Sequence, residues 1–257
     1  MVKSKEGVFE MTYWTNRVVL ITGGGTGIGR AVSTLLAERG ALVVLNYSRS
    51  QQAAEETVQH ILNQGGQAIS IQANVANDTE VRRMVKKVAD IYGSITDLVN
   101  NAGITHHIPL SDLEAVTDEV WNELMDVNVK GMFYCARAVT ESIKQAGGGA
   151  IVNLGSIAGS TGSGSSLPYA VSKSAVHGLT LSLAHALSPY IRVNAIVPGA
   201  VATRWWTGNE ERMHQLGGQL LLQQIAPPED IAHMICAALE QQSMTGQLIT
   251  VDGGQTL

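Results

Sequence analysis

The chain has 257 residues, of which 45% are hydrophobic and 15% are charged, and its formal net charge is −5. Because the net charge is weakly negative, we expect no broad positively charged surface, so nucleic acid is not an expected partner. No apolar run approaches the ~20 residues that a membrane-spanning helix needs, so a membrane partner is not expected either. The two cysteines, Cys135 and Cys236, fall in apolar helix-like stretches. We therefore expect a globular, cytoplasmic protein without a disulfide framework.

Strand-like and helix-like segments alternate along most of the chain. Apolar, β-branched runs predict strands at 17–22, 41–45, 68–72, 95–99, 150–154, 191–197 and 248–251. Helices are predicted between the glycines at 23–29 and Gly40, and at 51–64, 79–92, 119–145, 168–188 and 228–241, with a looser region at 203–224. This alternation predicts an α/β fold whose parallel sheet is covered on both faces. Since no linker, repeat or low-complexity segment interrupts it, we expect one domain at 15–257 after an N-terminal extension at 1–14.

The first strand runs directly into a glycine-rich loop, Gly23-Gly-Gly-Thr-Gly-Ile-Gly29, and then into a helix. Glycines allow a tight turn and a close approach of the backbone to a pyrophosphate, and the helix N-terminus offers free N–H groups. A bare turn is the alternative interpretation of the glycines by themselves. The order of strand, loop and helix favours phosphate binding.

The end of the second strand, Asn46-Tyr-Ser-Arg49, occupies the position where the adenosine ribose of a dinucleotide would lie. An acidic side chain there would bind the ribose 2′-OH and repel a 2′-phosphate, and none is present from Asn46 to Ser50. Arg49, helped by Ser48, could instead pair with a 2′-phosphate. The alternative is that Arg49 is a solvated loop charge.

Tyr169 and Lys173 are four residues apart in a predicted helix, so their side chains would share one face. Ser156 precedes Tyr169 by thirteen residues and follows a predicted buried strand. A tyrosine has a pKa of roughly 10, which burial would raise and a nearby ammonium would lower. A phenol tuned in this way can exchange a proton with a carbonyl or alcohol oxygen that a serine hydroxyl holds. A surface pair is the alternative for Tyr-x-x-x-Lys by itself.

Taken together, these pieces resemble the short-chain dehydrogenase/reductase family over about residues 15–257. The resemblance is carried by Thr22-Gly-Gly-Gly-Thr-Gly-Ile-Gly29, Asn100-Asn-Ala-Gly103, Asn128, Ser156, Tyr169-x-x-x-Lys173, Pro198-Gly199 and Val251-Asp-Gly-Gly254. It implies a Rossmann-type, doubly wound sheet of seven parallel strands, and a homotetramer. The most similar branch is that of the 3-oxoacyl-carrier-protein reductases and related carbonyl reductases.

The resemblance also implies roles for the matching residues. Tyr169 would be the acid/base, Lys173 would lower its pKa and bind the nicotinamide ribose, and Ser156 would orient the substrate oxygen. Asn128 would hold a water that links Lys173 to solvent, although a helix-surface amide is the alternative. The implied cofactor-binding residues also include Tyr169 and Lys173, and the others are Gly23, Gly25, Thr26, Gly27, Ile28, Tyr47, Ser48, Arg49, Asn74, Val75, Asn101, Ala102, Gly103, Pro198, Gly199, Val201 and Thr203.

Three departures from the family pattern bear on cofactor and substrate. Thr26 stands where many NADP-dependent members carry a basic residue, so NADP(H) is favoured through Arg49 while NAD(H) stays possible. Of the basic residues at which carrier-protein reductases dock their partner, only Lys144 remains. Trp205 and Trp206 open the segment that closes over substrate in the family, and two large rings there suggest an apolar wall. Packing in the core or on another subunit is the alternative for these tryptophans.

The expected function is therefore an NAD(P)H-dependent oxidoreductase that reduces a ketone, of 3-oxoacyl type or another carbonyl, to a secondary alcohol. A sugar, polyol or alcohol dehydrogenase working in the oxidative direction is an alternative. A dinucleotide-binding regulator without catalysis is a more remote one, because fold does not determine function. The spacing of His106, His107, His177 and His185 predicts no metal site.

Overall fold

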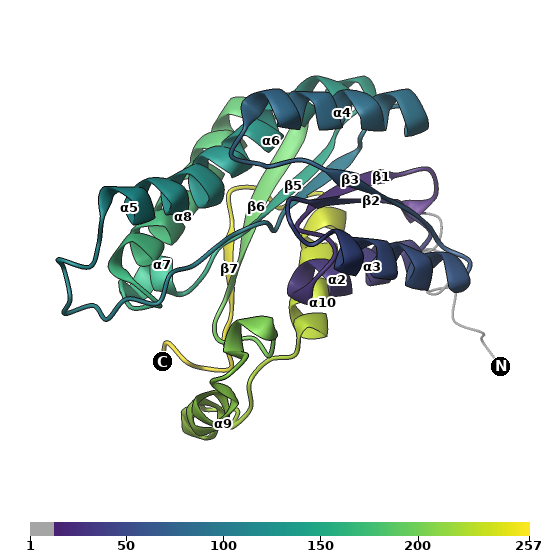
Figure 1. The fold of residues 1–257 in the computed structure, drawn as a ribbon. Helices are drawn as coiled ribbons and strands as arrows, with labels where there is room; N and C mark the ends of the chain where they lie inside the picture. The colour runs from purple at the N-terminus through teal and green to yellow at the C-terminus, as the bar shows by residue number, and fades with distance from the viewer. Residues whose placement is uncertain (1–12) are drawn as a thin grey trace.

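The computed structural model describes residues 13–257, which form one parallel sheet between two layers of helices (Figure 1). Seven strands are present in this part of the chain, in the order β3-β2-β1-β4-β5-β6-β7, and all neighbours are parallel. The order reverses direction at β1, which lies between β2 and β4, as in a doubly wound sheet. The strands are β1 (Val18–Thr22), β2 (Leu42–Tyr47), β3 (Gln67–Gln72), β4 (Asp97–Asn100), β5 (Gly149–Leu154), β6 (Ile191–Pro198) and β7 (Leu248–Val251).

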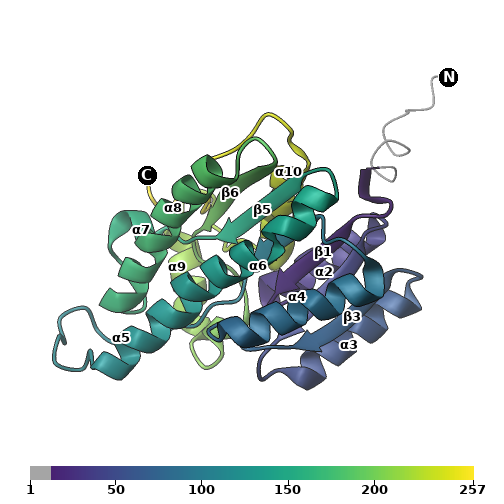
Figure 2. The ribbon, with the colours of Figure 1, turned by 90° about the horizontal axis from the view of Figure 1, so that it is seen from above.

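Each face of the sheet carries its own hydrophobic core. Along β1 the side chains of Val19 and Ile21 belong to one core, and those of Val18 and Leu20 belong to the other, because successive strand residues point to opposite faces. The helices that cover the first face are α2 (Gly27–Glu38), α3 (Gln51–Asn63) and α10 (Pro228–Glu240). The second face is covered by α4 (Asp78–Tyr92), α6 (Gly131–Gln145) and α8 (Leu167–Leu187), as seen from above in Figure 2.

The fold class predicted from the sequence is confirmed, with two local differences. The helix predicted at 119–145 consists of α5 (Asp118–Met125), a π-helical turn η1 (Asp126–Lys130) and α6. The looser region at 203–224 contains a 3₁₀ turn η2 (Arg204–Trp206) and the helix α9 (Glu210–Gln219). Neither difference changes the order of the sheet. A short helix α7 (Ala158–Thr161) also lies between β5 and α8.

Tyr13 and Trp14 are packed on the domain, although the sequence places them in an N-terminal extension. Trp14 is fully buried, and its indole Nε1 donates a hydrogen bond of 2.7 Å to Glu240 of α10. The hydroxyl of Tyr13 donates to the carbonyl of Leu239 over 3.0 Å. The remainder of the predicted extension, residues 1–12, lies outside the described residues.

No helix within residues 13–257 is long and apolar enough to cross a bilayer. The parallel arrangement brings the carboxyl ends of all the strands to one edge of the sheet. The loops that follow β1, β2, β4, β5 and β6 meet there, and η2 and α9 lie beyond this edge (Figure 1). In open α/β sheets the ligand crevice lies at this edge, next to the point where the strand order reverses.

Candidate active site

The first two turns of α8 hold Tyr169 and Lys173 in place. Ser166 is the N-cap of this helix, and its side chain accepts a hydrogen bond from the backbone N–H of Tyr169 at 3.4 Å. Pro168 occupies the first turn, where its missing N–H has no cost. Tyr169 and Lys173 are therefore one turn apart on the same face, and both are buried.

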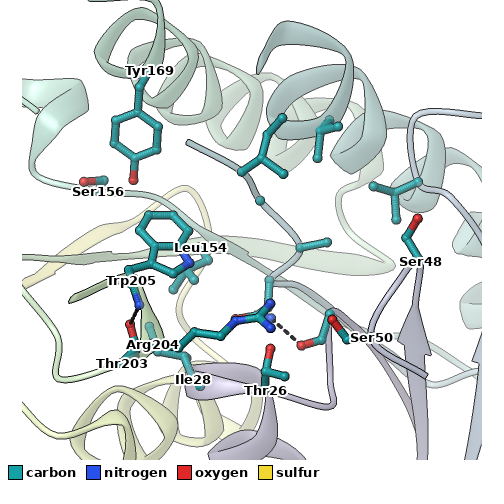
Figure 3. A pocket seen from close by; sticks show the side chains of 18 of the residues that line it. Thr26, Ile28, Ser48, Ser50, Leu154, Ser156, Tyr169, Thr203, Arg204 and Trp205 are labelled. Atoms are coloured by element: carbon teal, nitrogen blue, oxygen red, sulfur yellow. Dashed lines mark hydrogen bonds between the residues drawn. The ribbon is translucent and has the colours of Figure 1, made fainter. Parts of the chain in front are cut away.

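A chain of buried amides ties α8 to the centre of the sheet. The Asn100 amide in β4 donates to the side-chain oxygen of Asn153 in β5 at 2.9 Å. Asn153 in turn donates to the hydroxyl of Thr180 in α8 at 3.0 Å. Since buried polar groups are costly without partners, this network specifies how α8 sits on the two strands. Ser156 at the end of β5 is thereby held opposite Tyr169, as Figure 3 shows.

Lys173 is bonded to the backbone at the end of β5. Its Nζ donates a hydrogen bond of 2.8 Å to the carbonyl of Leu154, and it lies 5.9 Å from the centre of the Tyr169 ring. Burial lowers the pKa of the Lys173 ammonium to about 8, because a charged group is disfavoured away from water. The ammonium thus lies within reach of the phenol and of whatever occupies the cleft beside it.

The Tyr169 phenol has a raised pKa in this structure, which differs from the sequence-based expectation. Burial raises its pKa to about 12, and a hydrogen bond with Ser156 opposes this rise. The lowering expected from Lys173 is absent, since Lys173 is not among the groups that shift this phenol. The physical reason is that desolvation of the buried phenolate is the largest influence on this pKa. Tyr169 is therefore protonated at neutral pH, as a proton donor needs to be.

Asn128 is the predicted site residue that does not line the cleft. It lies in the π-helical turn η1 and is fully buried. Its side-chain oxygen accepts from the N–H of Ile104 at 2.9 Å, and its amide donates to the carbonyl of Ile104 and to the hydroxyl of Ser172. A Cβ added at Gly103 would lie 3.3 Å from the Asn128 oxygen and 3.8 Å from Lys173 Nζ. Asn128 thus joins the loop after β4 to α8 behind the cleft, next to Lys173.

The glycine-rich loop after β1 has the geometry of a phosphate-binding turn. Gly23 and Gly27 have φ angles of +64° and +51°, a region that side-chain-bearing residues rarely adopt. A Cβ at Gly25 would lie 2.7 Å from the Cα of Ala54, so this position also excludes a side chain. The Asn101 amide donates to the carbonyls of Thr22 and Gly23, which anchors the loop to the end of β4.

One cleft of about 840 Å³ runs along this edge of the sheet, within the size range of sites for small molecules and cofactors. Ser48 lies toward one end, and Ser156 and Tyr169 lie at the other (Figure 3). Arg49, which follows Ser48 in the chain, also lines the cleft. All the residues that the resemblance assigned to the cofactor line it. They are Gly23, Gly25, Thr26, Gly27, Ile28, Tyr47, Ser48, Arg49, Asn74, Val75, Asn101, Ala102, Gly103, Tyr169, Lys173, Pro198, Gly199, Val201 and Thr203.

The cleft fits a dinucleotide by its own features. The glycine turn lies at the N-terminus of α2, where free N–H groups favour a diphosphate. Ser48 and Arg49 at the far end provide a hydroxyl and a cation, and no carboxylate occurs from Asn46 to Ser50. Tyr169 and Lys173 would then lie at the nicotinamide end.

Several charged residues of the cleft were not predicted from the sequence. His107 and Glu123 come from the segment between β4 and η1, and Arg204 and Arg212 come from η2 and α9. Glu123 lies near Arg49, with 3.9 Å between its Oε1 and a guanidinium nitrogen of Arg49. These residues belong to no local motif, because only the folding of distant loops brings them to the cleft.

Trp205 lies over the Tyr169 phenol. The two ring centres are 6.1 Å apart at an interplanar angle of 71°, an edge-to-face arrangement, and the indole is visible beside the phenol in Figure 3. Trp206 also lines the cleft, and its indole Nε1 donates to the carbonyl of Val201 at 3.1 Å. Both tryptophans therefore line the site, as the sequence suggested, and Trp205 is the one that contacts the phenol.

Within residues 13–257, no group of three or more His, Cys, Asp or Glu side chains could hold a metal ion. His106 pairs instead with Glu123 at 2.9 Å, and His177 is buried against the backbone of Gly155. The functional groups of the cleft are therefore a phenol, an amine, hydroxyls, guanidinium groups, an imidazole and two carboxylates.

Comparisons with known proteins agree with this geometry. The short chain dehydrogenase family profile matches residues 17–214. The short-chain dehydrogenase/reductase homolog YusR of Bacillus subtilis is 67% identical over 129 residues, which are 50% of this chain and all of that protein. A putative ketoacyl reductase 2 of the granaticin polyketide synthase of Streptomyces violaceoruber is 37% identical over 244 residues, covering 93% of this chain and 96% of that protein.

A solved structure of similar shape is a short chain dehydrogenase from Burkholderia cenocepacia in complex with NADP. It is 31% identical and covers 95% of this chain and 99% of that one, with a TM-score of 0.87. The chain thus belongs to the short-chain dehydrogenase/reductase family and is an oxidoreductase of that family.

Proposed function

We propose that the protein reduces a ketone to a secondary alcohol, reversibly, at the Tyr169 end of the cleft, and that NADP(H) is its favoured cofactor. The observation that carries this proposal is the gathering of Ser156, Tyr169 and Lys173 at one end of a glycine-lined cleft. A nicotinamide dinucleotide, when bound, supplies the reducing equivalent. The residues of the chain supply binding, orientation and the proton.

In the proposed mechanism Tyr169 donates its phenolic proton to the carbonyl oxygen of the ketone, and it takes the proton back when the alcohol is oxidised. Ser156 holds the same oxygen through its hydroxyl. Lys173 would bind the nicotinamide ribose beside the phenol, since its ammonium lies 5.9 Å from the ring centre. Closure of the cleft by Trp205 excludes water from these groups.

Asn128 is proposed as a positioning residue that acts through Lys173. Its side-chain hydrogen bonds to Ile104 and Ser172 hold the π-helical turn next to the amine. A water on this turn would connect Lys173 to solvent and replace the proton that Tyr169 gives up.

The preference for NADP(H) is proposed from Arg49 and Ser48, which lie at the nucleotide end of the cleft. The relative from Burkholderia cenocepacia was solved with NADP, which supports the same choice. Thr26 provides no cation, so we expect NAD(H) to be used less well but not excluded.

The substrate class is proposed as a 3-oxoacyl-type ketone or another apolar ketone. Trp205 and Trp206 line the cleft near the phenol, and the relative from Streptomyces violaceoruber is described as a putative ketoacyl reductase. The sugar or polyol dehydrogenase alternative predicts hydroxyl-binding side chains there. The tryptophans favour an apolar substrate over that alternative.

The experiment is to follow NADPH oxidation at 340 nm with a panel of 3-oxoacyl thioesters, 3-oxo esters and simple ketones, and NADP⁺ reduction with polyols. Turnover of the ketones and weak turnover of the polyols are expected. If the dinucleotide binds but no carbonyl compound or alcohol is turned over, the chain is a dinucleotide-binding regulator and the enzymatic proposal is wrong.

Assembly as a homotetramer is also proposed. Phe133 of α6 and Val171 and Leu181 of α8 are large apolar side chains that remain exposed. Closed two-fold interfaces would cover them. Sedimentation equilibrium at micromolar concentration should show four chains per particle, and a monomer would contradict the proposal.

A further inference from the structure

The 3₁₀ turn η2 places two adjacent side chains at different parts of the cleft. Thr203, which precedes the turn, rests on the glycine-rich loop, since a Cβ at Gly27 would lie 3.4 Å from its methyl carbon. Arg204 follows directly, and Figure 3 shows its side chain beside Ile28 and Thr26. Trp205 comes next and contacts the Tyr169 phenol. One turn therefore spans the distance from the phosphate-binding loop to the catalytic end.

Arg204 has no counter-charge in the part of the chain that the structure describes. It takes part in no ion pair among residues 13–257, whereas Arg49 lies near Glu123. A guanidinium group is always charged and presents paired donors that match a phosphate. An unpaired guanidinium next to a glycine loop is suited to an anion at that loop.

We propose that Arg204 binds the diphosphate of the dinucleotide and that this contact holds Trp205 in its position against Tyr169. The proposal rests on the dinucleotide-dependent function given above. The diphosphate is preferred over the 2′-phosphate because Arg204 is joined to the loop at Gly27 through Thr203, while Ser48 and Arg49 lie at the far end of the cleft. The loop N–H groups and the guanidinium would then hold the diphosphate from two sides.

This arrangement links cofactor binding to the ketone site. Because Arg204 and Trp205 are neighbours in a three-residue turn, fixing one side chain restricts the other. The wall of the ketone site next to Tyr169 would be held in place when the diphosphate is bound. Thr26 provides no cation for the 2′-phosphate. Arg204, about 180 residues further along the chain, would instead provide a cation for the diphosphate.

Binding of cofactor fragments tests the proposal without requiring turnover. Calorimetry with Arg204→Ala should show about tenfold weaker binding of ADP-ribose, which contains the diphosphate but no nicotinamide. Adenosine 2′-monophosphate carries neither phosphate of the diphosphate, and its affinity should change by less than about twofold. Arg83→Ala, at an exposed position of α4 outside the cleft, is the matched control and should bind both ligands as the wild type does.

Three results would overturn the assignment: unchanged affinity of Arg204→Ala for ADP-ribose, equal loss for both ligands, or loss for the 2′-monophosphate alone. The last of these would place the guanidinium on the 2′-phosphate. Failure of the wild type to bind either ligand would instead contradict the proposed function itself, so the two failures are distinguishable.

Tryptophan fluorescence tests the link to Trp205. Saturating ADP-ribose should change the emission of the wild type, excited at 295 nm, because Trp205 becomes more rigidly held against the phenol. The change should be lost in Trp205→Phe and in Arg204→Ala at saturation, and it should persist in Arg83→Ala. A change of full size in Trp205→Phe, or in saturated Arg204→Ala, would disprove the coupling.

Discussion

The two ends of the cleft differ most in their exposure to water. At the catalytic end Tyr169 is 7% exposed and Lys173 is 3% exposed, whereas the Arg49 side chain at the nucleotide end is 89% exposed. Desolvation therefore determines the ionisation of the buried pair, raising one pKa and lowering the other. At the exposed end charges are hydrated and screened, so Arg49 acts only when a ligand phosphate comes close. Substitutions at the two ends should accordingly change different properties.

The largest expected effect is loss of the proton donor at the buried end. Tyr169→Phe keeps the ring and its contact with Trp205 but removes the hydroxyl. Turnover should fall by at least ~10²-fold, the usual scale of acid/base catalysis, while dinucleotide binding is retained. Steady-state kinetics and calorimetry measure the two quantities, and near-normal turnover would refute the role of Tyr169.

The second effect concerns stability and pH at Lys173. Its pKa of about 8 in the folded chain lies below the ordinary value of 10.5, so the folded state binds fewer protons between these values. The resulting destabilisation is complete below pH 8 and disappears as the pH rises to 10.5. Lys173→Met has no titrating amine at this position, so it lacks this pH-dependent destabilisation. The variant should therefore be more stable than the wild type by a larger margin at pH 7 than at pH 9.5, where the wild type has regained most of the lost free energy of unfolding.

The expected decrease in this margin is on the order of 1–2 kcal/mol, because one pKa unit corresponds to about 1.4 kcal/mol. Urea unfolding of both proteins at the two pH values measures this decrease. Titrating groups that both proteins share contribute equally to each free energy of unfolding, so they cancel in the difference. A constant difference would show that the Lys173 amine does not titrate in this range.

The third effect tests the exposed end. Arg49→Ala should lower the ratio of kcat/KM for NADPH to that for NADH by about tenfold, since one charge-assisted contact with the 2′-phosphate is lost. Turnover with saturating NADH should be unchanged, in contrast to Tyr169→Phe. If the ratio stays the same, Arg49 is a solvated charge that does not select the cofactor.

The smallest effect is expected at Trp205, which is 44% exposed and connects the two ends. Trp205→Ala should raise KM for an apolar ketone about two- to tenfold, the range of one edge-to-face aromatic contact. Tyr190→Ala is a matched control, because Tyr190 is an exposed aromatic residue outside the cleft. An equal rise in KM for both variants would argue against a substrate wall.

The fold and the buried end of the cleft could be predicted closely from local sequence patterns. Apolar runs and helical periods specify which segments enter the sheet, and the strands at 150–154 and 191–197 agree with β5 and β6 within one residue at each end. The spacing of Ser156, Tyr169 and Lys173 is also local, because one strand end and one helix carry all three. Such patterns act over a few residues, so sequence alone contains them.

Three features were decided only by tertiary structure. The π-helical turn at Asn128 and the burial of Trp14 depend on contacts with segments far away in sequence, Ile104 and Glu240. The pKa of Tyr169 is about 12 because the whole fold removes water from the phenol, an effect that no motif expresses.

The sequence by itself determined the α/β architecture, the glycine turn and the group of Ser156, Tyr169 and Lys173. Their signals are local periodicity, backbone freedom and short spacing. Only the tertiary structure decided that Arg204 lines the same cleft as the glycine-rich loop and that Glu123 lies 3.9 Å from Arg49, because these side chains come from segments that meet at the sheet edge after folding. Local interactions depend on residues that are close in the sequence. The charges around a cleft come instead from distant segments that packing of the core brings together.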